Sequence, residues 1–460
     1  MMSSETGVAR WFGSSGDGDA LQRAWFACLT ALVASLVLAN LIVDYRLDVK
    51  FGWDAVVNCA AVDAHIEGLD PYFVKNLKGT KLSYPYLPVT LDAFRPLCAG
   101  GFLVGHYRGI YLVLAVLAGL LLPGLRHPRQ SLHDALLKVL WCLGAFVGLE
   151  WILAAGNFAF FSGLLTAVAL ALLLGRGSSE AGDDDRFLLR LAGAAVLGLL
   201  TSFKLVFLPV LASLCFLPER RHRKLILIAV AASAFMMPIL ISMVFYADLF
   251  SSWLSAISGQ IPGQHSVALD ETNQSLLLLA WGLADHYGLA DSKPFVFAVY
   301  GLVAIALVIA PFTLFVLRVV RDRGSPGAGS PLERLDRGLI DHPGQATRIT
   351  ALSMYALYLC SPRLKEYAFF ELAIYAAVLI ADLRPMALAA VLTCGIALPN
   401  LASISGSTLL ESFGQAAAAL VCFWIMLFDF RTTDLSSTTD ASRCDPQQVD
   451  DRHPDACCSA

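Results

Sequence analysis

The sequence predicts an all-α polytopic membrane protein, and three observations support that fold class. Of the 460 residues, 57% are hydrophobic and 15% are charged, whereas a soluble domain carries about a quarter charged residues. The mean hydropathy is +0.65. Apolar runs of roughly 17 to 25 residues fit a hydrocarbon core about 30 Å thick. Because backbone in lipid must satisfy its own hydrogen bonds, we expect these runs to be helices.

Successive apolar runs predict about twelve spans, several of them short. They are residues 24–43, 106–122, 135–153, 159–174, 187–202, 205–217, 225–246, 294–317, 349–360, 368–381, 386–401 and 409–430. The first run is long for the core of a signal peptide, and we expect it to be a retained anchor. A further run, 87–104, carries Asp92 and Arg95. Charges at mid-membrane cost a few kcal/mol each, so we expect this run to be an interfacial or re-entrant helix.

Arginine clusters set the predicted orientation. With these spans, the clusters at 126–129, 176–190, 220–224, 318–348 and 384 all fall on one side, which the positive-inside rule makes cytoplasmic. We expect a disordered cytoplasmic N-terminus at 1–20, a catalytic transmembrane domain at 21–430 and a disordered cytoplasmic tail at 431–460. Within the domain, 44–105 and 247–292 are predicted outer loops and 318–348 a cytoplasmic loop.

The eleven cysteines show no metal-type spacing, and we expect most to be small buried side chains. Cys59 and Cys98 could meet on the outer side, although sequence alone does not pair them. Cys457 and Cys458 in the tail could carry lipid.

The first outer loop holds the candidate catalytic carboxylate. Asp54 stands just past the membrane exit, at the head of a helix-compatible segment, where it could accept a proton from an attacking hydroxyl. It could equally be a helix N-cap. Asn58 and His65 follow at i+4 and i+11 on the same helical face, whereas Asp63, Glu67 and Asp70 share another face. We expect no metal site here, and a paired-carboxylate glycosidase fits poorly with a scaffold embedded in lipid.

Other polar residues gather on the predicted outer side. Lys204, between two apolar segments, is costly in a membrane unless it meets water or an anion such as a lipid phosphate; snorkelling to the interface is the alternative. Arg363 and Lys365 could add a phosphate clamp. Asn273 and Gln274 could bind sugar hydroxyls or cap the short helix that follows them.

Five motifs occur in a defined order along residues 20–430. They are the N-terminal signature Asp54, Ala60-Ala61, Gly68-x-Asp70-Pro71-Tyr72 and Tyr84-Pro85-x-Leu87; Gly156-Asn157; Lys204 before a proline-containing apolar helix; Asn273-Gln274-Ser275; and Ser361-Pro362. Together they resemble glycosyltransferase family 87, the bacterial polyprenol-phosphate-mannose-dependent mannosyltransferases with the GT-C fold. The chain departs from the family pattern at Val57-Asn58, at Tyr86 and after Ser361-Pro362.

The resemblance implies an inverting transfer without metal or cofactor, with Asp54 as the base. It also implies a polyprenyl-phosphate sugar donor that enters from the outer leaflet, with Lys204 and Arg363 on its phosphate. We expect a lipid or glycan acceptor, no nucleic-acid partner, and an active site on the outer face of the cell membrane. The expected substrate-binding residues are Asn58, His65, Tyr72, Tyr84, Asn157, Asn273 and Gln274.

Two other functions remain open from the sequence. A transporter or lipid flippase would place ionisable groups at mid-membrane and show two matching halves. Here the ionisable groups gather on one side, which favours an interfacial enzyme. A catalytically inactive relative that acts as an assembly subunit would explain the departures after Asp54.

Overall fold

The computed structural model describes residues 17–42, 51–124, 131–175, 183–261, 273–323, 331–406 and 413–441. These residues form helices and the turns between them. No β-strand occurs among them, and the one β-bridge they contain pairs Asn273 with Lys365. The all-helical fold predicted from the apolar runs is therefore confirmed.

Seven helical segments in the described part are long and apolar enough to cross a membrane. They are Arg23–Ile42, Val89–Leu121, Leu132–Ala155, Asp184–Phe203, Arg221–Phe245, Lys293–Val319 and Pro385–Ser405. Four shorter apolar helices accompany them: Ala159–Leu174, Leu205–Phe216, Leu276–His286 and Gly414–Phe430. A multi-pass membrane protein follows from the seven long segments, whereas the count of twelve spans stays a prediction.

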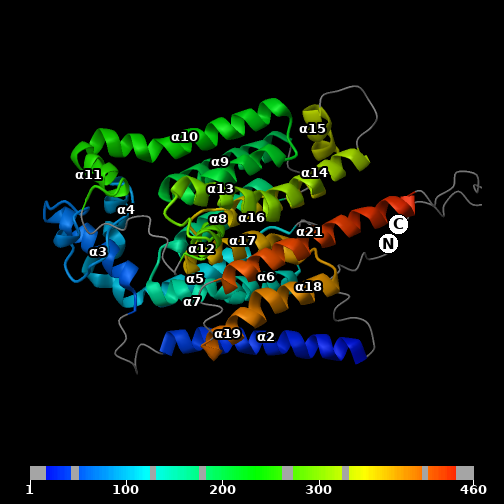
Figure 1. Ribbon diagram of the computed structural model, residues 1–460, viewed down its shortest axis with the longest axis horizontal. Helices are drawn as coiled ribbons and strands as arrows, with labels where there is room; N and C mark the ends of the chain where they lie inside the picture. Colours follow the sequence, from blue (N-terminus) through cyan, green and yellow to red (C-terminus); the bar gives the residue numbers. More distant parts are fainter. Residues whose placement is uncertain are drawn as a thin grey trace, which may run out of the picture.

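The bundle consists of long helices that run roughly side by side (Figure 1). Its members are α2 (Asp17–Ile42), α5 (Phe102–Leu121), α6 (Leu132–Gly144), α7 (Gly148–Ala155), α8 (Ala159–Leu174), α9 (Asp183–Phe203), η5 (Leu205–Phe216), α10 (Arg221–Phe245), α14 (Ala310–Arg323), α16 (Pro343–Leu359), α17 (Phe369–Ile380), α18 (Pro385–Leu392), α19 (Leu398–Ser405) and α21 (Gly414–Ala441). Short helical turns join some of these: η4 (Ala145–Val147) lies between α6 and α7, and η8 (Thr393–Ala397) lies between α18 and α19. A further turn, η6 (Ile305–Ile309), leads into α14 from the helix before it.

Helix α17 forms the centre of this bundle. Each of its twelve residues is buried, and it contacts α6, α8 and α16. A helix that is apolar on every side must be surrounded by protein or lipid, and here it is surrounded by other helices. The acid within it, Glu371, is therefore held inside the protein.

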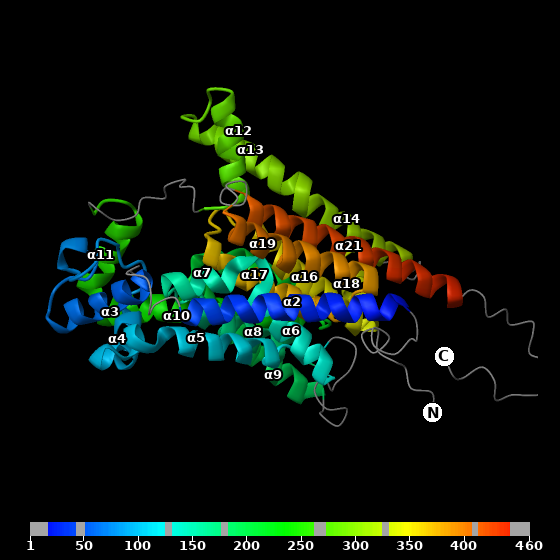
Figure 2. The same cartoon turned by 90° about the horizontal axis from the view of Figure 1, so that it is seen from below.

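Shorter helices lie at one end of the bundle. Helices α3 (Trp53–Ile66), α4 (Val89–Cys98) and α11 (Ala247–Ile257) gather there (Figure 1), while α12 (Leu276–His286) and α13 (Lys293–Ala304) stand off to one side (Figure 2). Two short helical turns, η2 (Val74–Asn76) and η7 (Glu366–Ala368), also occur in the described part of the chain. Much of the predicted outer loops is thus helical.

The run predicted as re-entrant, 87–104, forms α4, the turn η3 (Ala99–Gly101) and the first turn of α5. The chain bends at Gly100 and Gly101, which have φ angles of +62° and +73°. Glycine adopts this left-handed conformation without a side-chain clash. Both glycines also belong to the candidate span Val89–Leu121, and an interfacial or re-entrant position for 87–104 stays a prediction.

Ion pairs link the helix ends at the opposite side of the bundle, where α15 (Pro331–Asp341) lies (Figure 1). The pairs are Arg190–Glu219, Arg223–Asp184, Arg223–Glu219, Lys224–Asp336, Arg348–Asp382 and Arg384–Asp429. All five of these cations belong to the arginine clusters that the sequence predicted to be cytoplasmic. These arginine ion pairs and the short α3–α4 region therefore occupy opposite ends of the molecule.

Parts of the two ends that were predicted to be disordered are helical. Helix α2 begins at Asp17, so residues 17–20 are helical, and α21 continues to Ala441, so 431–441 are helical too. Once an apolar helix has formed, each further residue adds one backbone hydrogen bond, and the helix extends into polar sequence. Residues 1–16 and 442–460, including Cys457 and Cys458, lie outside the described residues.

Candidate functional site

Two glycines bring the start of α3 against the end of α7. Gly52 precedes α3 with φ +79°, and Gly156 follows α7 with φ +68°. The Gly52 N–H donates to the Ala154 carbonyl at 2.8 Å. A Cβ on Gly156 would lie 3.0 Å from the Gly52 Cα and 3.0 Å from the Ala55 Cβ. Only glycine permits both this conformation and this approach, and the contact sets the position of Asp54.

Asn157, directly after Gly156, bonds to the carboxylate of Asp54. Its Nδ2 donates to Asp54 Oδ2 at 2.5 Å, and its Oδ1 accepts from the Ala159 N–H at 2.9 Å. Because the amide oxygen is used at the start of α8, the amide NH₂ faces the carboxylate. Asp54 is thus half-exposed, fixed by a donor, and placed in the first turn of a helix, where the helix dipole favours a negative charge.

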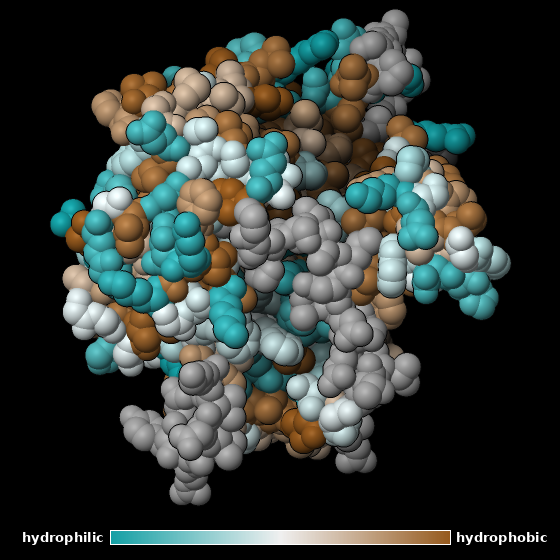
Figure 3. All heavy atoms as spheres, turned by 60° about the vertical axis from the view of Figure 1, so that its left-hand side comes forward, coloured by the Kyte–Doolittle hydropathy of each residue, from teal (hydrophilic) through white to brown (hydrophobic). Residues whose placement is uncertain are grey.

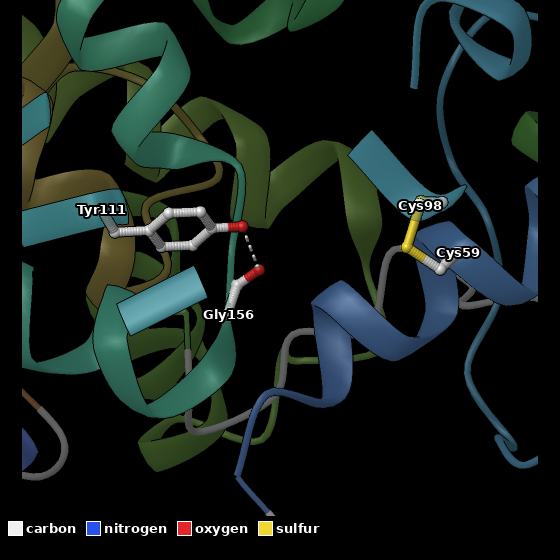
Figure 4. Close-up of a disulfide and its surroundings, with 4 residues drawn as sticks. All are labelled: Cys59, Cys98, Tyr111 and Gly156. Atoms are coloured by element: carbon white, nitrogen blue, oxygen red, sulfur yellow. Dashed lines mark hydrogen bonds between the residues drawn. A yellow bond between two sulfur atoms is a disulfide. The ribbon is translucent and has the colours of Figure 1, made fainter. Parts of the chain in front are cut away.

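Tyr111 of α5 stabilises the same junction. Its hydroxyl donates to the Gly156 carbonyl at 3.2 Å, and Figure 4 shows this bond beside the junction. The same view shows a disulfide between Cys59 and Cys98, which joins α3 to α4. Helix α3 is therefore fastened at its start by the glycine contact and at its middle by a covalent bond.

Lys204 lies in the turn between α9 and η5, outside both apolar helices. Its Nζ donates to Ser162 Oγ at 3.3 Å and lies 5.5 Å from the centre of the Tyr367 ring. Burial lowers the pKa of the Lys204 ammonium, while the carboxylates of Glu371 and Asp54 act in the opposite direction. The lysine charge is thus part of the same electrostatic group as Asp54.

Aromatic rings pack beside the segments that carry Lys204 and Asn157. Tyr86 stacks on Phe203 with ring centres 4.5 Å apart, and Phe94 stacks on Phe158 at 4.3 Å. Phe203 precedes Lys204 and Phe158 follows Asn157 in the chain. These stacked pairs therefore restrict the backbone on which the lysine and the amide are carried.

Glu371 was not found by the sequence analysis. Its side chain is 0% exposed; Ser162 donates to its Oε1, and Thr166 donates to its Oε2 at 3.4 Å. An acid inside an apolar run is a recognised signal of a functional position in a membrane protein. That signal was present in the run 368–381, but its partners lie about two hundred residues earlier in the chain.

The Asn273-Gln274-Ser275 motif holds the Ser361-Pro362 corner. Asn273 Nδ2 donates to the Pro362 carbonyl at 3.1 Å, and its Oδ1 accepts from the Leu364 N–H at 2.7 Å. Gln274 Oε1 accepts from the Gln415 N–H at 3.1 Å. Two motifs separated by almost ninety residues are thus one structural unit, and sugar binding by these two amides stays a prediction.

Ser275 caps the short helix, which is one of the two roles that the sequence left open for this motif, and it also binds the Ser361-Pro362 corner. Its hydroxyl donates to the Pro362 carbonyl at 2.9 Å and also accepts from the Leu278 N–H, which caps α12. The corner beyond it carries Arg363, which is exposed, and Lys365, which is half-buried. Tyr367, two residues further on, contacts Lys204, so the corner ends beside the lysine.

Tyr72 and Tyr84 are completely buried. The Tyr72 hydroxyl donates to the Tyr86 carbonyl at 2.7 Å, and the Tyr84 hydroxyl bonds to Thr90 Oγ1. Burial raises the pKa of both phenols, so both remain neutral. The two hydroxyls therefore bond to other residues of the same loop and stabilise it, and contact with substrate stays a prediction.

The other two predicted residues of α3 differ in position. Asn58 is buried one turn after Asp54. His65 lies near the other end of the helix, about 16 Å along its axis, with its ring 6.3 Å from that of Tyr246. His65 is therefore remote from Asp54 and contributes to the contact between α3 and the end of α10.

Hydrophilic side chains gather on the end of the molecule that carries this site (Figure 3). Exposed charged residues there include Asp63, Glu67, Lys75, Lys78, Lys81, Asp92 and Arg95. Among the residues that the structure describes, no three His, Cys, Asp or Glu side chains are close enough to hold a metal ion.

A comparison with known families matches part of the chain, and the matched part does not include Asp54. The family model for glycosyltransferase family 87 matches residues 84–330. That range includes Tyr84, Asn157, Lys204 and the Asn273-Gln274-Ser275 motif. No curated protein and no solved structure matches the chain.

Proposed function

The chain belongs to glycosyltransferase family 87, and we propose that it moves one sugar from a polyprenyl-phosphate carrier to a hydroxyl of a lipid or glycan. Mannose is the first candidate for the sugar. The acceptor and the donor would meet at the α3–α7 junction, on the outer face of the cell membrane.

One observation carries this proposal: a carboxylate, an amide and an ammonium from distant parts of the chain converge at one end of the bundle. Asp54 bonds to Asn157 at 2.5 Å, and the charge of Lys204 acts on Asp54 from the end of α9. Transfer between an acceptor hydroxyl and a phosphate-bound sugar needs both a base and a cation. The site supplies both on neighbouring backbone segments.

In the proposed reaction, Asp54 takes the proton of the acceptor hydroxyl. The oxygen attacks the anomeric carbon from the side opposite the phosphate, and the bond between that carbon and the phosphate oxygen breaks. The configuration at the anomeric carbon is inverted, and polyprenyl phosphate leaves with one more negative charge. Lys204, Arg363 and Lys365 would stabilise that charge.

The disulfide supports an outward-facing site. Disulfides persist in oxidising compartments and are rare in the cytosol, and Cys59–Cys98 lies on the helix that carries Asp54. The arginine ion pairs occupy the other end of the bundle. Both observations agree with catalysis outside and a cytoplasmic arginine-rich end.

Membership of a glycosyltransferase family weighs against the transporter alternative. A catalytically inactive relative would keep the fold but transfer no sugar. A transfer assay therefore distinguishes an active enzyme from an inactive relative. Full-length protein in proteoliposomes is given radiolabelled polyprenyl-phosphate mannose, and its membrane products are extracted and counted. Sugar in a lipid or glycan product would establish transfer.

We predict that Asp54→Asn lowers the transfer rate by about 10²- to 10⁴-fold, because asparagine cannot accept the hydroxyl proton. Asp63→Asn is the matched control. It removes an exposed carboxylate from the same helix, and we expect it to leave transfer unchanged. Equal activity of Asp54→Asn and wild type would refute the assignment of the base.

A further inference from the structure

We propose that Glu371 is a positioning residue for Lys204 and acts through the hydroxyl of Ser162. The inference rests on the proposed function, because it concerns the cation that would meet the donor phosphate. Glu371 itself would touch no substrate, since its side chain is 0% exposed.

The hydrogen bonds give the arrangement a direction. Lys204 Nζ can only donate, so Ser162 Oγ accepts from it at 3.3 Å. Ser162 has one proton, and an ionised carboxylate accepts a hydrogen bond more strongly than a backbone carbonyl does. The Ser162 proton therefore points to Glu371 rather than to the Ala159 carbonyl, which lies 3.0 Å away. The result is an ordered series from lysine through serine to glutamate.

Several charged and titratable groups lie against the hydrogen-bonded residues Lys204, Ser162 and Glu371. Asp54 of α3 and Glu371 of α17 act on Lys204, and Tyr367 of η7 lies against it. Tyr358 of α16 and Tyr375 of α17 face Glu371. Glu371 is the carboxylate that acts most strongly on the lysine.

The partly buried ammonium of Lys204 loses part of its hydration, and a carboxylate nearby compensates for some of that loss. Without Glu371, the Lys204 ammonium would be less favoured and free to adopt other rotamers, because a lysine side chain has four rotatable bonds. The donor phosphate would then meet a cation that is less often charged and less well placed. Glu371 therefore affects donor binding rather than the proton transfer at Asp54.

The chain offers a matched set of variants. Glu371→Gln keeps the shape and removes the charge. Ser162→Ala removes the hydroxyl between Glu371 and Lys204. Thr166→Val removes a hydroxyl that also donates to Glu371 and makes no contact with the lysine among the bonds described. A role limited to the stability of the core would affect all three variants alike.

The test measures the binding of farnesyl phosphate and of farnesol to the full-length protein in detergent. We expect Glu371→Gln and Ser162→Ala to weaken farnesyl phosphate binding about tenfold, the effect of losing one hydrogen bond to a charged group. Farnesol binding should be unchanged, and Thr166→Val should resemble wild type for both compounds. The loss in Glu371→Gln should grow between about pH 7 and about pH 9 as its lysine loses the proton.

Three results would overturn the inference. The first is an equal loss of farnesyl phosphate binding in all three variants, and the second is a loss of farnesol binding in parallel. The third is tighter binding of farnesyl phosphate by Glu371→Gln, which would show that Glu371 competes with the phosphate for Lys204. The melting temperature shows whether a variant has folded. If Glu371→Gln does not fold, the comparison of Ser162→Ala with Thr166→Val tests the inference. Failure of the proposed function is a separate result: wild type would bind farnesyl phosphate in this pattern and transfer no sugar.

Discussion

At the residue scale, the charge of Lys204 should set the pH dependence of donor use. Burial lowers the pKa of its ammonium below the ordinary value of about 10.4. A lysine is charged below its pKa and neutral above it, so the positive charge is lost as the pH rises through the lowered value. We predict that KM for the donor rises on the alkaline side while KM for the acceptor changes little.

Lys204→Arg separates this cause from other alkaline effects. Arginine stays charged at every accessible pH, so its donor KM should be flat between about pH 6 and about pH 9 even if its value is higher. Steady-state kinetics with the two substrates varied in turn gives both constants. An alkaline rise of the same size in Lys204→Arg would show that another group titrates.

At the element scale, the contact between α3 and α7 should be more important to activity than to folding. Gly156 and Gly68 both have left-handed φ angles, +68° and +73°. An alanine at either position costs about 1–2 kcal/mol of backbone strain. At Gly156 the added methyl group also meets Gly52 and Ala55 at 3.0 Å, whereas nothing lies within 4 Å of a Cβ on Gly68.

We therefore predict that Gly156→Ala and Gly68→Ala both lower the melting temperature, but that Gly156→Ala also lowers transfer. The reason is that the methyl group would move Asn157 away from Asp54. Melting and transfer are measured on the same preparations. Activity losses in proportion to the stability losses, for both variants, would contradict a specific role for the junction.

The same elements show why the sequence predicted part of the site and not the rest. Asn157 and Lys204 each stand just after an apolar run, and Asp54 stands in the loop that follows the first run. Alternating spans place these three positions on the same side of a membrane. Their convergence could therefore be predicted from the order of the runs. The bonding of Asn273 to Pro362 and Leu364 could not, because no local pattern encodes a contact between segments almost ninety residues apart.

Glu371 and the helix lengths were missed for a related reason. The hydrophobic runs predict that helices exist, but their ends depend on neighbours: α9 extends to residue 183 and α16 starts at residue 343, each beyond its apolar run. The environment of Glu371 depends on Ser162 and Thr166 of α8. Such environments become visible only when the helices are packed together.

At the scale of the whole molecule, the two ends of the bundle should face opposite compartments. The α3–α4 end carries the Cys59–Cys98 disulfide and exposed charges of both signs, and the other end carries the arginine ion pairs and α15 (Figure 1). Positive charge is retained in the cytoplasm, and disulfides form outside it. Two independent physical rules thus give the same orientation.

We predict that a cysteine placed at Lys75 is labelled from outside intact cells by a membrane-impermeant maleimide, and that one at Arg337 is labelled only after the membrane is opened. Both side chains are exposed. Lys75 belongs to η2, between α3 and α4 in the chain, and Arg337 belongs to α15, which lies at the end of the molecule opposite α3 and α4 (Figure 1). The unsubstituted protein, treated in the same way, corrects for labelling of its own free cysteines. The reverse pattern would place Asp54 in the cytoplasm, where a donor on the outer leaflet could not reach it, and the proposed reaction would then need a carrier on the inner leaflet.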